Sequence, residues 1–133
     1  MPVPSFLAAS LFVVLGGGLG AWLRYTCGVM ISRALGPAAQ FPWATLGVNV
    51  LGSLAMGLLA GWLARPGSHS ESWRLLLGVG LLGGFTTFSA FSLELALMIE
   101  RGTMATAAIY VSVSVIAGVA ALFVGLALMR VAA

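Results

Sequence analysis

Long apolar runs without charge alternate with short segments that carry Arg, Glu, Pro or Gly. A helix needs about 20 apolar residues to cross a bilayer. The pattern predicts four membrane-spanning helices at about 5–25, 43–63, 75–99 and 104–129. We therefore expect an all-α membrane protein in which residues 1–133 form a single four-helix transmembrane domain.

The segments between the runs mark where the predicted spans end. Gly36, Pro37 and Pro42 delay the second span, and Trp43 stands where an aromatic side chain anchors a helix at the membrane surface. The segment 65–71 is a predicted polar loop in which His69 is solvated, and Glu100-Arg101-Gly102 is a predicted tight turn. The first run lacks a basic segment before it, so we expect a retained helix and not a cleaved signal.

Composition makes lipid the expected solvent of this chain. Hydrophobic residues make up 61% and charged residues 7%, whereas about a quarter of the residues of a soluble domain are charged. The six Arg residues are scattered, which excludes a basic patch for nucleic acid. One cysteine, Cys27, and one histidine exclude a disulfide framework and a Cys/His metal site.

The arginines are divided almost evenly between the two sides of the predicted membrane domain. The side that holds both termini carries Arg65, Arg74 and Arg130, and the other carries Arg33 and Arg101, with Arg24 close by. Because an excess of Lys and Arg normally sets orientation, this balance favours insertion in both directions and pairing with an inverted second copy. The alternative is that another feature fixes a single orientation.

Small residues recur at a spacing of four in three of the predicted helices. Such spacing lets membrane helices approach closely and predicts a tight bundle. The repeats are Gly16-x-x-x-Gly20, Ser53-x-x-x-Gly57-x-x-x-Gly61 and Ala117-x-x-x-Ala121-x-x-x-Gly125.

The segment 83–92, GGFTTFSAFS, is the densest polar cluster in the chain and falls in the third predicted span. Two glycines followed by two threonines weaken a helix, so we expect a break whose freed carbonyl groups hold a small cation. An intact helix with its hydroxyls bonded to its own backbone is the alternative. Phe88 and Phe91 share a face with Ser92. Their rings are either ordinary contacts with lipid or core, or, held edge-on, groups whose positive edges favour a small anion.

Other polar residues lie at helical spacing in the second and fourth spans. Asn49 follows Thr45 by four residues, and Ser114 follows Tyr110 by four. Each is either a hydrogen-bonding contact between helices or a donor along a polar path. Glu94, after the polar cluster, is a candidate proton carrier, a residue at a wet pore mouth or a partner of an Arg.

The cluster 83–92 resembles the signature of the CrcB/Fluc fluoride channels. The likeness extends to Gly16–Gly20 with Arg24-Tyr25, to WATLGVNVLG at 43–52 and to Tyr110–Ser114, and so covers all four helices. The resemblance implies a dual-topology antiparallel homodimer with two fluoride pores. The resemblance implies that Phe88 and Phe91 are the pore phenylalanines.

The resemblance also implies roles for further residues. Asn49 would be the amide donor of the pore, and the polar path would include Thr45, Ser89, Tyr110 and Ser114. Glu94 would lie near the pore track and Arg24 near a vestibule. The carbonyl groups of Gly83 and Thr86 from both subunits would hold one central sodium ion. Two positions depart from the family pattern, Gly118 where some relatives carry a hydroxyl and Ala90 where a threonine is frequent.

We therefore predict a passive, fluoride-selective channel, not an enzyme, in the bacterial inner membrane. No nucleophile with a base, metal-ligand spacing or phosphate loop is found. Its partners are fluoride, membrane lipid and a second copy of the chain. A proton-coupled dual-topology exporter with Glu94 as carrier is the first alternative. An accessory subunit of a larger membrane complex is the second.

Overall fold

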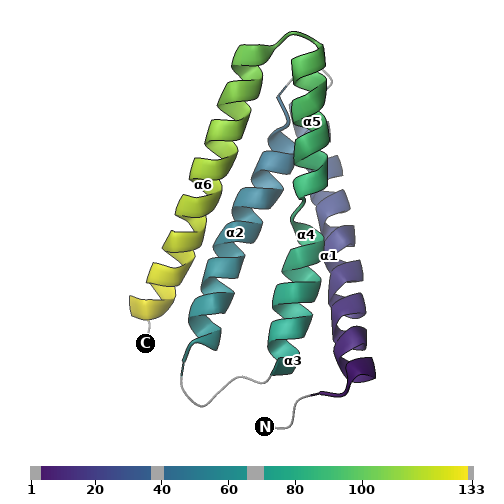
Figure 1. Cartoon of the computed structure of the whole chain (residues 1–133), viewed down its shortest axis with the longest axis vertical. Coiled ribbons are helices and arrows are strands. Elements are labelled where there is room, and N and C mark those ends of the chain that lie inside the picture. The colour runs from purple at the N-terminus through teal and green to yellow at the C-terminus, as the bar shows by residue number, and fades with distance from the viewer. Residues whose placement is uncertain (1–3, 37–40, 66–70, 132–133) are drawn as a thin grey trace.

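The computed structural model describes residues 4–36, 41–65 and 71–131. The expected loop around His69 lies outside these ranges. The described residues form four long rods of helix (Figure 1). The elements are α1 (Phe6–Leu35), α2 (Trp43–Leu63), α3 (Glu71–Trp73), η1 (Arg74–Leu82), α4 (Gly83–Phe85), α5 (Phe88–Glu100) and α6 (Met104–Val131), where α3 to α5 together make the third rod.

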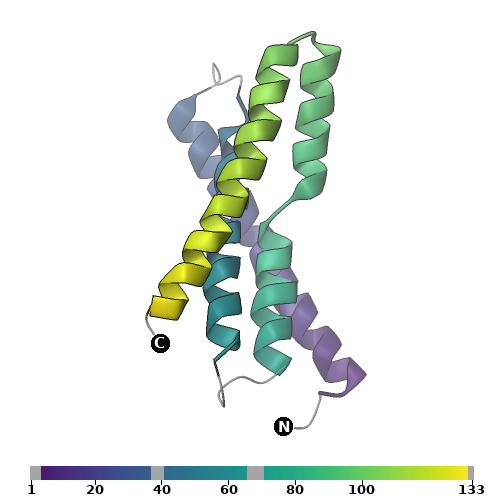
Figure 2. The ribbon, with the colours of Figure 1, turned by 60° about the vertical axis from the view of Figure 1, so that its left-hand side comes forward.

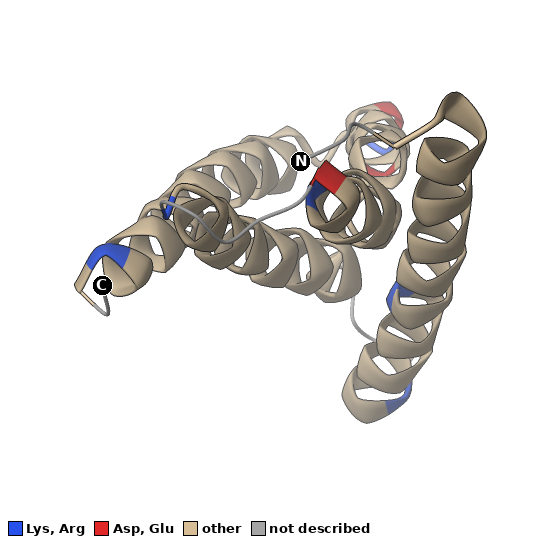
Figure 3. Ribbon diagram, turned by 90° about the horizontal axis from the view of Figure 1, so that it is seen from below, with Lys and Arg blue, Asp and Glu red and all other residues tan. Residues whose placement is uncertain are grey.

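Four helical stretches within the described ranges are long and apolar enough to cross a membrane, which confirms the predicted all-α class with four candidate spans. They are Phe6–Leu35, Trp43–Leu63, Glu71–Glu100 and Met104–Val131. The start of α1 and the end of α6 lie at the same end of the molecule (Figure 1). Most of the ribbon is uncharged (Figure 3), which suits a surface facing lipid.

Helix α1 continues ten residues beyond Tyr25, where its membrane span is predicted to end. A charged residue ends the segment that is favourable in lipid. It does not end the helix, because Arg24 and Tyr25 both allow helical backbone hydrogen bonding. Ser5 caps the start of the helix, and its Oγ accepts a hydrogen bond from the Ala8 N–H at 3.3 Å. It ends where Gly36 takes a φ of 74°, a conformation suited to glycine.

The third rod has irregular backbone along much of its length. Residues Arg74–Leu82 form a π-helix, a rare geometry that is frequent at functional sites. Helix α4 ends at Phe85, and Thr86 (ψ 159°) and Thr87 (φ −149°, ψ 120°) are extended. Helix α5 then starts at Phe88, with the Thr87 Oγ1 accepting a hydrogen bond from the Ala90 N–H at 3.2 Å. The thin connection between the two helices is visible in Figure 2.

Glycines bring the helices together in two close pairs. Helix α1 packs on η1 and α4, where a Cβ on Gly20 would collide with the backbone of Leu81 and Phe85. Helix α2 packs on α6, where a Cβ on Gly57 would collide with the backbone of Leu122. These contacts confirm that the small-residue repeats mediate close packing.

Candidate functional site

Asn49 bridges from α2 to the extended connection between α4 and α5. Its Nδ2 donates to the Thr87 carbonyl at 2.9 Å, and its Oδ1 accepts from the Thr87 N–H at 2.8 Å. One peptide group on each side of Thr87 is thereby bonded to the same side chain. A primary amide carries two N–H donors, so one hydrogen of Asn49 Nδ2 remains for another acceptor.

The pairing with Asn49 changes the hydrogen bonding of Gly83. In a continuous α-helix the Thr87 N–H would bond the carbonyl four residues earlier, which belongs to Gly83. Here that N–H is diverted to Asn49, and Gly83 is solvent-exposed. The bond from the Thr87 N–H to Asn49 therefore also leaves the Gly83 carbonyl without its helical donor.

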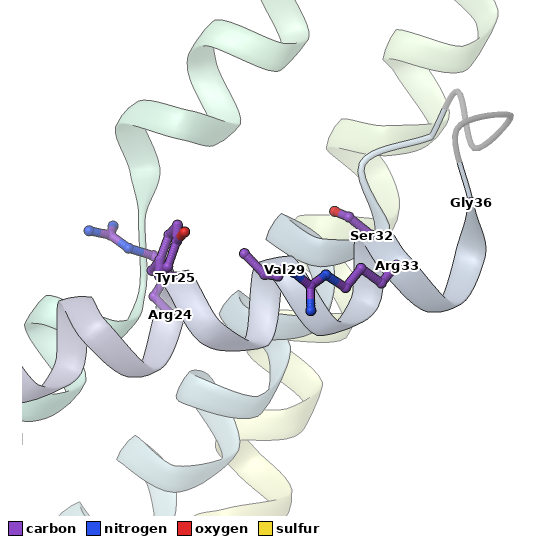
Figure 4. Close-up of a pocket in the computed structure, with 7 residues that line it drawn as sticks. Arg24, Tyr25, Val29, Ser32, Arg33 and Gly36 are labelled. Carbon is purple, nitrogen blue, oxygen red and sulfur yellow. The ribbon is translucent and has the colours of Figure 1, made fainter.

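Arg24 reaches the same connection from α1. Its Nη1 donates to the Thr86 carbonyl at 3.3 Å. Figure 4 shows this side chain extending from α1 toward the connection, while Arg33 lies further along α1. Both arginines line an open hollow of about 630 Å³ along the C-terminal part of α1. That Arg24 lies near a vestibule stays a prediction.

Glu94 on α5 accepts hydrogen bonds from two of the predicted path residues. The Thr45 hydroxyl donates to Glu94 Oε1 at 2.6 Å, and the Tyr110 hydroxyl donates to Glu94 Oε2 at 2.7 Å. Thr45 is 8% exposed and Tyr110 is fully buried. Helices α2, α5 and α6 therefore meet around one carboxyl group whose two oxygens are both bonded by neutral hydroxyls.

The two predicted pore phenylalanines lie in contact but in different surroundings. Their ring centroids are 5.8 Å apart with the rings tilted by 38°. Phe88 is 79% exposed, whereas Phe91 packs against a buried cluster that includes Leu46 and Tyr110. The Phe91 ring lies 5.0 Å from that of Tyr110, so a line of rings leads from the α4–α5 connection to Glu94.

The remaining predicted hydroxyls are less closely connected to this line. Ser89 Oγ lies 3.4 Å from Thr87 Oγ1, and Ser92 donates to the Phe88 carbonyl at 2.9 Å. Ser114 Oγ is buried and has no hydrogen-bond partner within the part of the chain that the structure describes. A buried hydroxyl without a partner is costly, so Ser114 is available to a further acceptor or donor.

Two cavities flank Thr87. One of about 290 Å³ is lined by residues of α2, the connection and α6, among them Asn49, Ser53, Thr86 and Phe88. Another, of about 150 Å³, is lined by residues that include Arg24, Gly28, Thr45 and Ala90. Polar groups predicted from the sequence therefore line space on both sides of the connection.

Sequence reasoning missed two participants, Thr87 and Phe41. Thr87 pairs with Asn49 through backbone atoms, which no residue pattern reveals. Phe41 lies before α2, and its ring meets that of Tyr110 edge-on at 5.4 Å and 81°. The adjacent Pro42 was a signal, because proline fixes the direction in which the chain leaves Phe41.

The fold and site together define a multi-pass membrane protein with a line of polar and aromatic groups between its helices. Residues 11–126 match the family described as "CrcB-like protein, Camphor Resistance (CrcB)", and the chain belongs to this family.

Curated relatives are similar over nearly their whole length. A protein of Novosphingobium aromaticivorans is 59% identical over 93% of this chain and 98% of its own. One of Erythrobacter litoralis is 56% identical over 93% of each chain. One of Phenylobacterium zucineum is 56% identical over 93% of this chain and 97% of its own. All three are named "Fluoride-specific ion channel FluC".

Proposed function

We propose that this protein is a fluoride-selective channel through which fluoride leaves the cell passively, down its electrochemical gradient. The observation that carries the proposal is its high identity over 93% of the chain to relatives named as fluoride-specific channels. Those relatives are named as channels and not as enzymes. The line of donors and rings around Asn49, Phe91 and Glu94 gives the proposal a physical basis.

Fluoride is small and strongly hydrated, so a selective path must replace its water with closely placed donors. Asn49 lines the 290 Å³ cavity, and the second hydrogen of its amide is such a donor. Phe88 and Phe91 then offer ring edges, which carry positive electrostatic potential. Ser89 and Ser114 add hydroxyl donors. Arg24 is bonded to the Thr86 carbonyl beside this line, and none of the described residues that form the line itself is a cation, so the ion can leave quickly.

Glu94 lies where the line of rings ends, and its charge would repel an anion. Its two oxygens are engaged by the hydroxyls of Thr45 and Tyr110. Hydroxyl groups rotate, so either can turn its hydrogen toward a passing fluoride while the other stays on the carboxyl group. The ion can therefore pass while at least one hydroxyl group still donates a hydrogen bond to the carboxyl group of Glu94.

The functional unit in this proposal is an antiparallel, dual-topology homodimer. Phe88 is 79% exposed beside the α4–α5 connection, and a second copy would cover it. The nearly equal numbers of arginines on the two sides permit insertion in both orientations.

A structural sodium ion at the centre of that dimer completes the proposal. Hard cations prefer oxygen ligands, and backbone carbonyls freed from a helix supply them in membrane proteins. The Gly83 carbonyl lacks its helical donor, so its oxygen fits this role. The Thr86 carbonyl accepts a hydrogen bond from Arg24 in the single chain, so Arg24 would have to release it before Thr86 could bind the ion. The ion would tie four carbonyl groups of two chains together. Transfer of the purified protein to sodium-free buffer should then lower its melting temperature, with potassium unable to restore it.

The decisive experiment is anion efflux from liposomes that hold the purified protein. A fluoride electrode should record rapid loss of fluoride, and a chloride electrode should record no loss of chloride. Chloride efflux at a similar rate, or no fluoride efflux from folded protein, would refute the proposed function.

A further inference from the structure

Tyr110 is held from two sides. The Tyr110 hydroxyl bonds Glu94 at 2.7 Å, and its ring contacts Phe91 on one side and Phe41 on another. Tyr110 is fully buried, so its ring cannot move without moving one of these neighbours. Phe91 belongs to the predicted pore, whereas Phe41 is outside the residues that sequence or family likeness assigned.

The segment Phe41-Pro42-Trp43 forms a tight turn that directs Phe41 inward. The Trp43 N–H donates to the Phe41 carbonyl at 2.8 Å, and Pro42 has φ −80° and ψ 63°. These are the bond and the angles of an inverse γ-turn. The Pro42 carbonyl then accepts the hydrogen bond of the Leu46 N–H, at 3.1 Å, in the first turn of α2.

The turn stacks aromatic rings at the end of α2. The Phe41 ring lies 4.6 Å from the Trp43 ring and packs against the buried cluster of Leu46, Met98, Ala107 and Tyr110. Trp43 is 50% exposed, so it stands between this cluster and the surroundings. Counted from Phe88, the contacts run through Phe91 and Tyr110 to Phe41 and Trp43.

We propose that Phe41 is a positioning residue of the ion path, one that fixes the Tyr110 ring and, through the Tyr110 hydroxyl, the carboxyl group of Glu94. An edge-to-face contact restricts the tilt of the ring it meets. The Tyr110 hydroxyl must point at Glu94 and yet turn toward a passing ion, which requires a ring held in one place. This inference rests on the proposed fluoride channel and adds a residue from outside the helices to its mechanism.

A double-mutant cycle between Phe41 and Tyr110, read as fluoride efflux from liposomes, tests the proposal. Phe41→Leu should lower the rate roughly threefold to tenfold, the effect of losing one aromatic contact. Phe41→Trp, which keeps an aromatic edge, should recover most of the rate. In a Tyr110→Phe background, where no hydroxyl remains to be positioned, Phe41→Leu should have little further effect.

Phe123→Leu is the matched control, since Phe123 lies on α6 with Tyr110 but is 64% exposed. Its efflux should equal that of the unmodified protein. If Phe41→Leu leaves the rate unchanged, or lowers it by the same factor with and without the Tyr110 hydroxyl, the positioning role is refuted. Absence of efflux from the unmodified protein would instead refute the channel itself.

Fluorine NMR supplies a readout that does not depend on transport. The chain has two tyrosines, so fluorotyrosine labelling gives two signals that Tyr110→Phe assigns. Phe41→Leu should shift and broaden the Tyr110 signal and leave that of Tyr25 in place. An unchanged Tyr110 signal would refute the contact and the inference with it.

Discussion

The side chain of Asn49 and the backbone of Thr87 exchange two hydrogen bonds, of 2.9 and 2.8 Å, and these hold the connection between α4 and α5 against α2. Asn49 was predicted as a donor that lines a polar path. The structure adds the pairing with Thr87, which uses one of the two amide hydrogens of Asn49 and leaves the other for the path.

Replacement of Asn49 by Asp keeps the shape of the side chain but removes its donor. The carboxylate can accept from the Thr87 N–H but faces the Thr87 carbonyl with an oxygen, at a cost of about 1–3 kcal/mol. We expect fluoride efflux to fall by roughly tenfold or more, while size-exclusion chromatography still shows the oligomeric state of the unmodified protein. Ser112→Ala is a suitable control because Ser112 Oγ bonds only within α6, to the Ala108 carbonyl, among the bonds described. Unchanged efflux in Asn49→Asp would contradict the role of Asn49 as a donor to the ion and the need for its bond to the Thr87 carbonyl.

The two phenylalanines should respond differently to replacement by Ile. Phe88 is 79% exposed in the single chain and would be covered by the second copy only in the proposed dimer, so Phe88→Ile should lower fluoride efflux and should lower the melting temperature of the detergent-solubilised protein less than Phe91→Ile does. Phe91 packs on the buried cluster, so Phe91→Ile should lower both, with a stability loss of about 1 kcal/mol or more. Equal efflux in Phe88→Ile and the unmodified protein would remove Phe88 from the path.

Glu94→Gln distinguishes a channel from a proton-coupled exporter. Gln retains one oxygen to accept from Thr45 or Tyr110. We expect slower efflux that still follows the fluoride gradient alone. The measurement compares efflux with and without an imposed pH gradient, after subtraction of protein-free liposomes, because hydrogen fluoride crosses lipid by itself. Accumulation of fluoride against its gradient, lost in Glu94→Gln, would favour the exporter.

Two glycines on α1 provide a matched test of helix packing. A Cβ at position 20 would overlap the backbone of Leu81 and Phe85, whereas one at position 18 meets nothing within 4 Å. Gly20→Ala should therefore destabilise the fold by about 1–3 kcal/mol. Gly18→Ala should be neutral or stabilising by up to about 1 kcal/mol. Melting temperatures in detergent measure both, and equal values would contradict the close α1–α4 contact.

Much of the architecture follows from the apolar pattern. The second span at 43–63 coincides with α2, and the glycine repeats correspond to the two tight helix pairs. The length of α1 could not be predicted from charge, because Arg24 and Tyr25 mark the end of a lipid-compatible stretch without ending the helix. The π-helical geometry of η1 also has no signature in residue type alone.

The sequence identified most residues of the candidate site, but it predicted only some of the contacts between them. Thr45, Glu94 and Tyr110 were each identified, yet nothing in their spacing placed them around a single carboxyl group. That arrangement depends on how α5 and α6 meet beyond the turn at Gly102, whose φ is 75°. The sequence did not single out Phe41, because a phenylalanine before a membrane helix is common. The turn at Pro42 brings its ring to that of Tyr110.

The pairing of Asn49 with backbone atoms has a consequence for how this protein can evolve. At position 49 the side chain itself is required, whereas at position 87 any residue with an N–H completes the pair. Only the capping of α5 by the Thr87 hydroxyl limits the choice there, to residues such as Ser, Asp or Asn. Substitutions at the two positions are therefore uncoupled, and covariation between related sequences would leave this contact undetected, although the two residues touch.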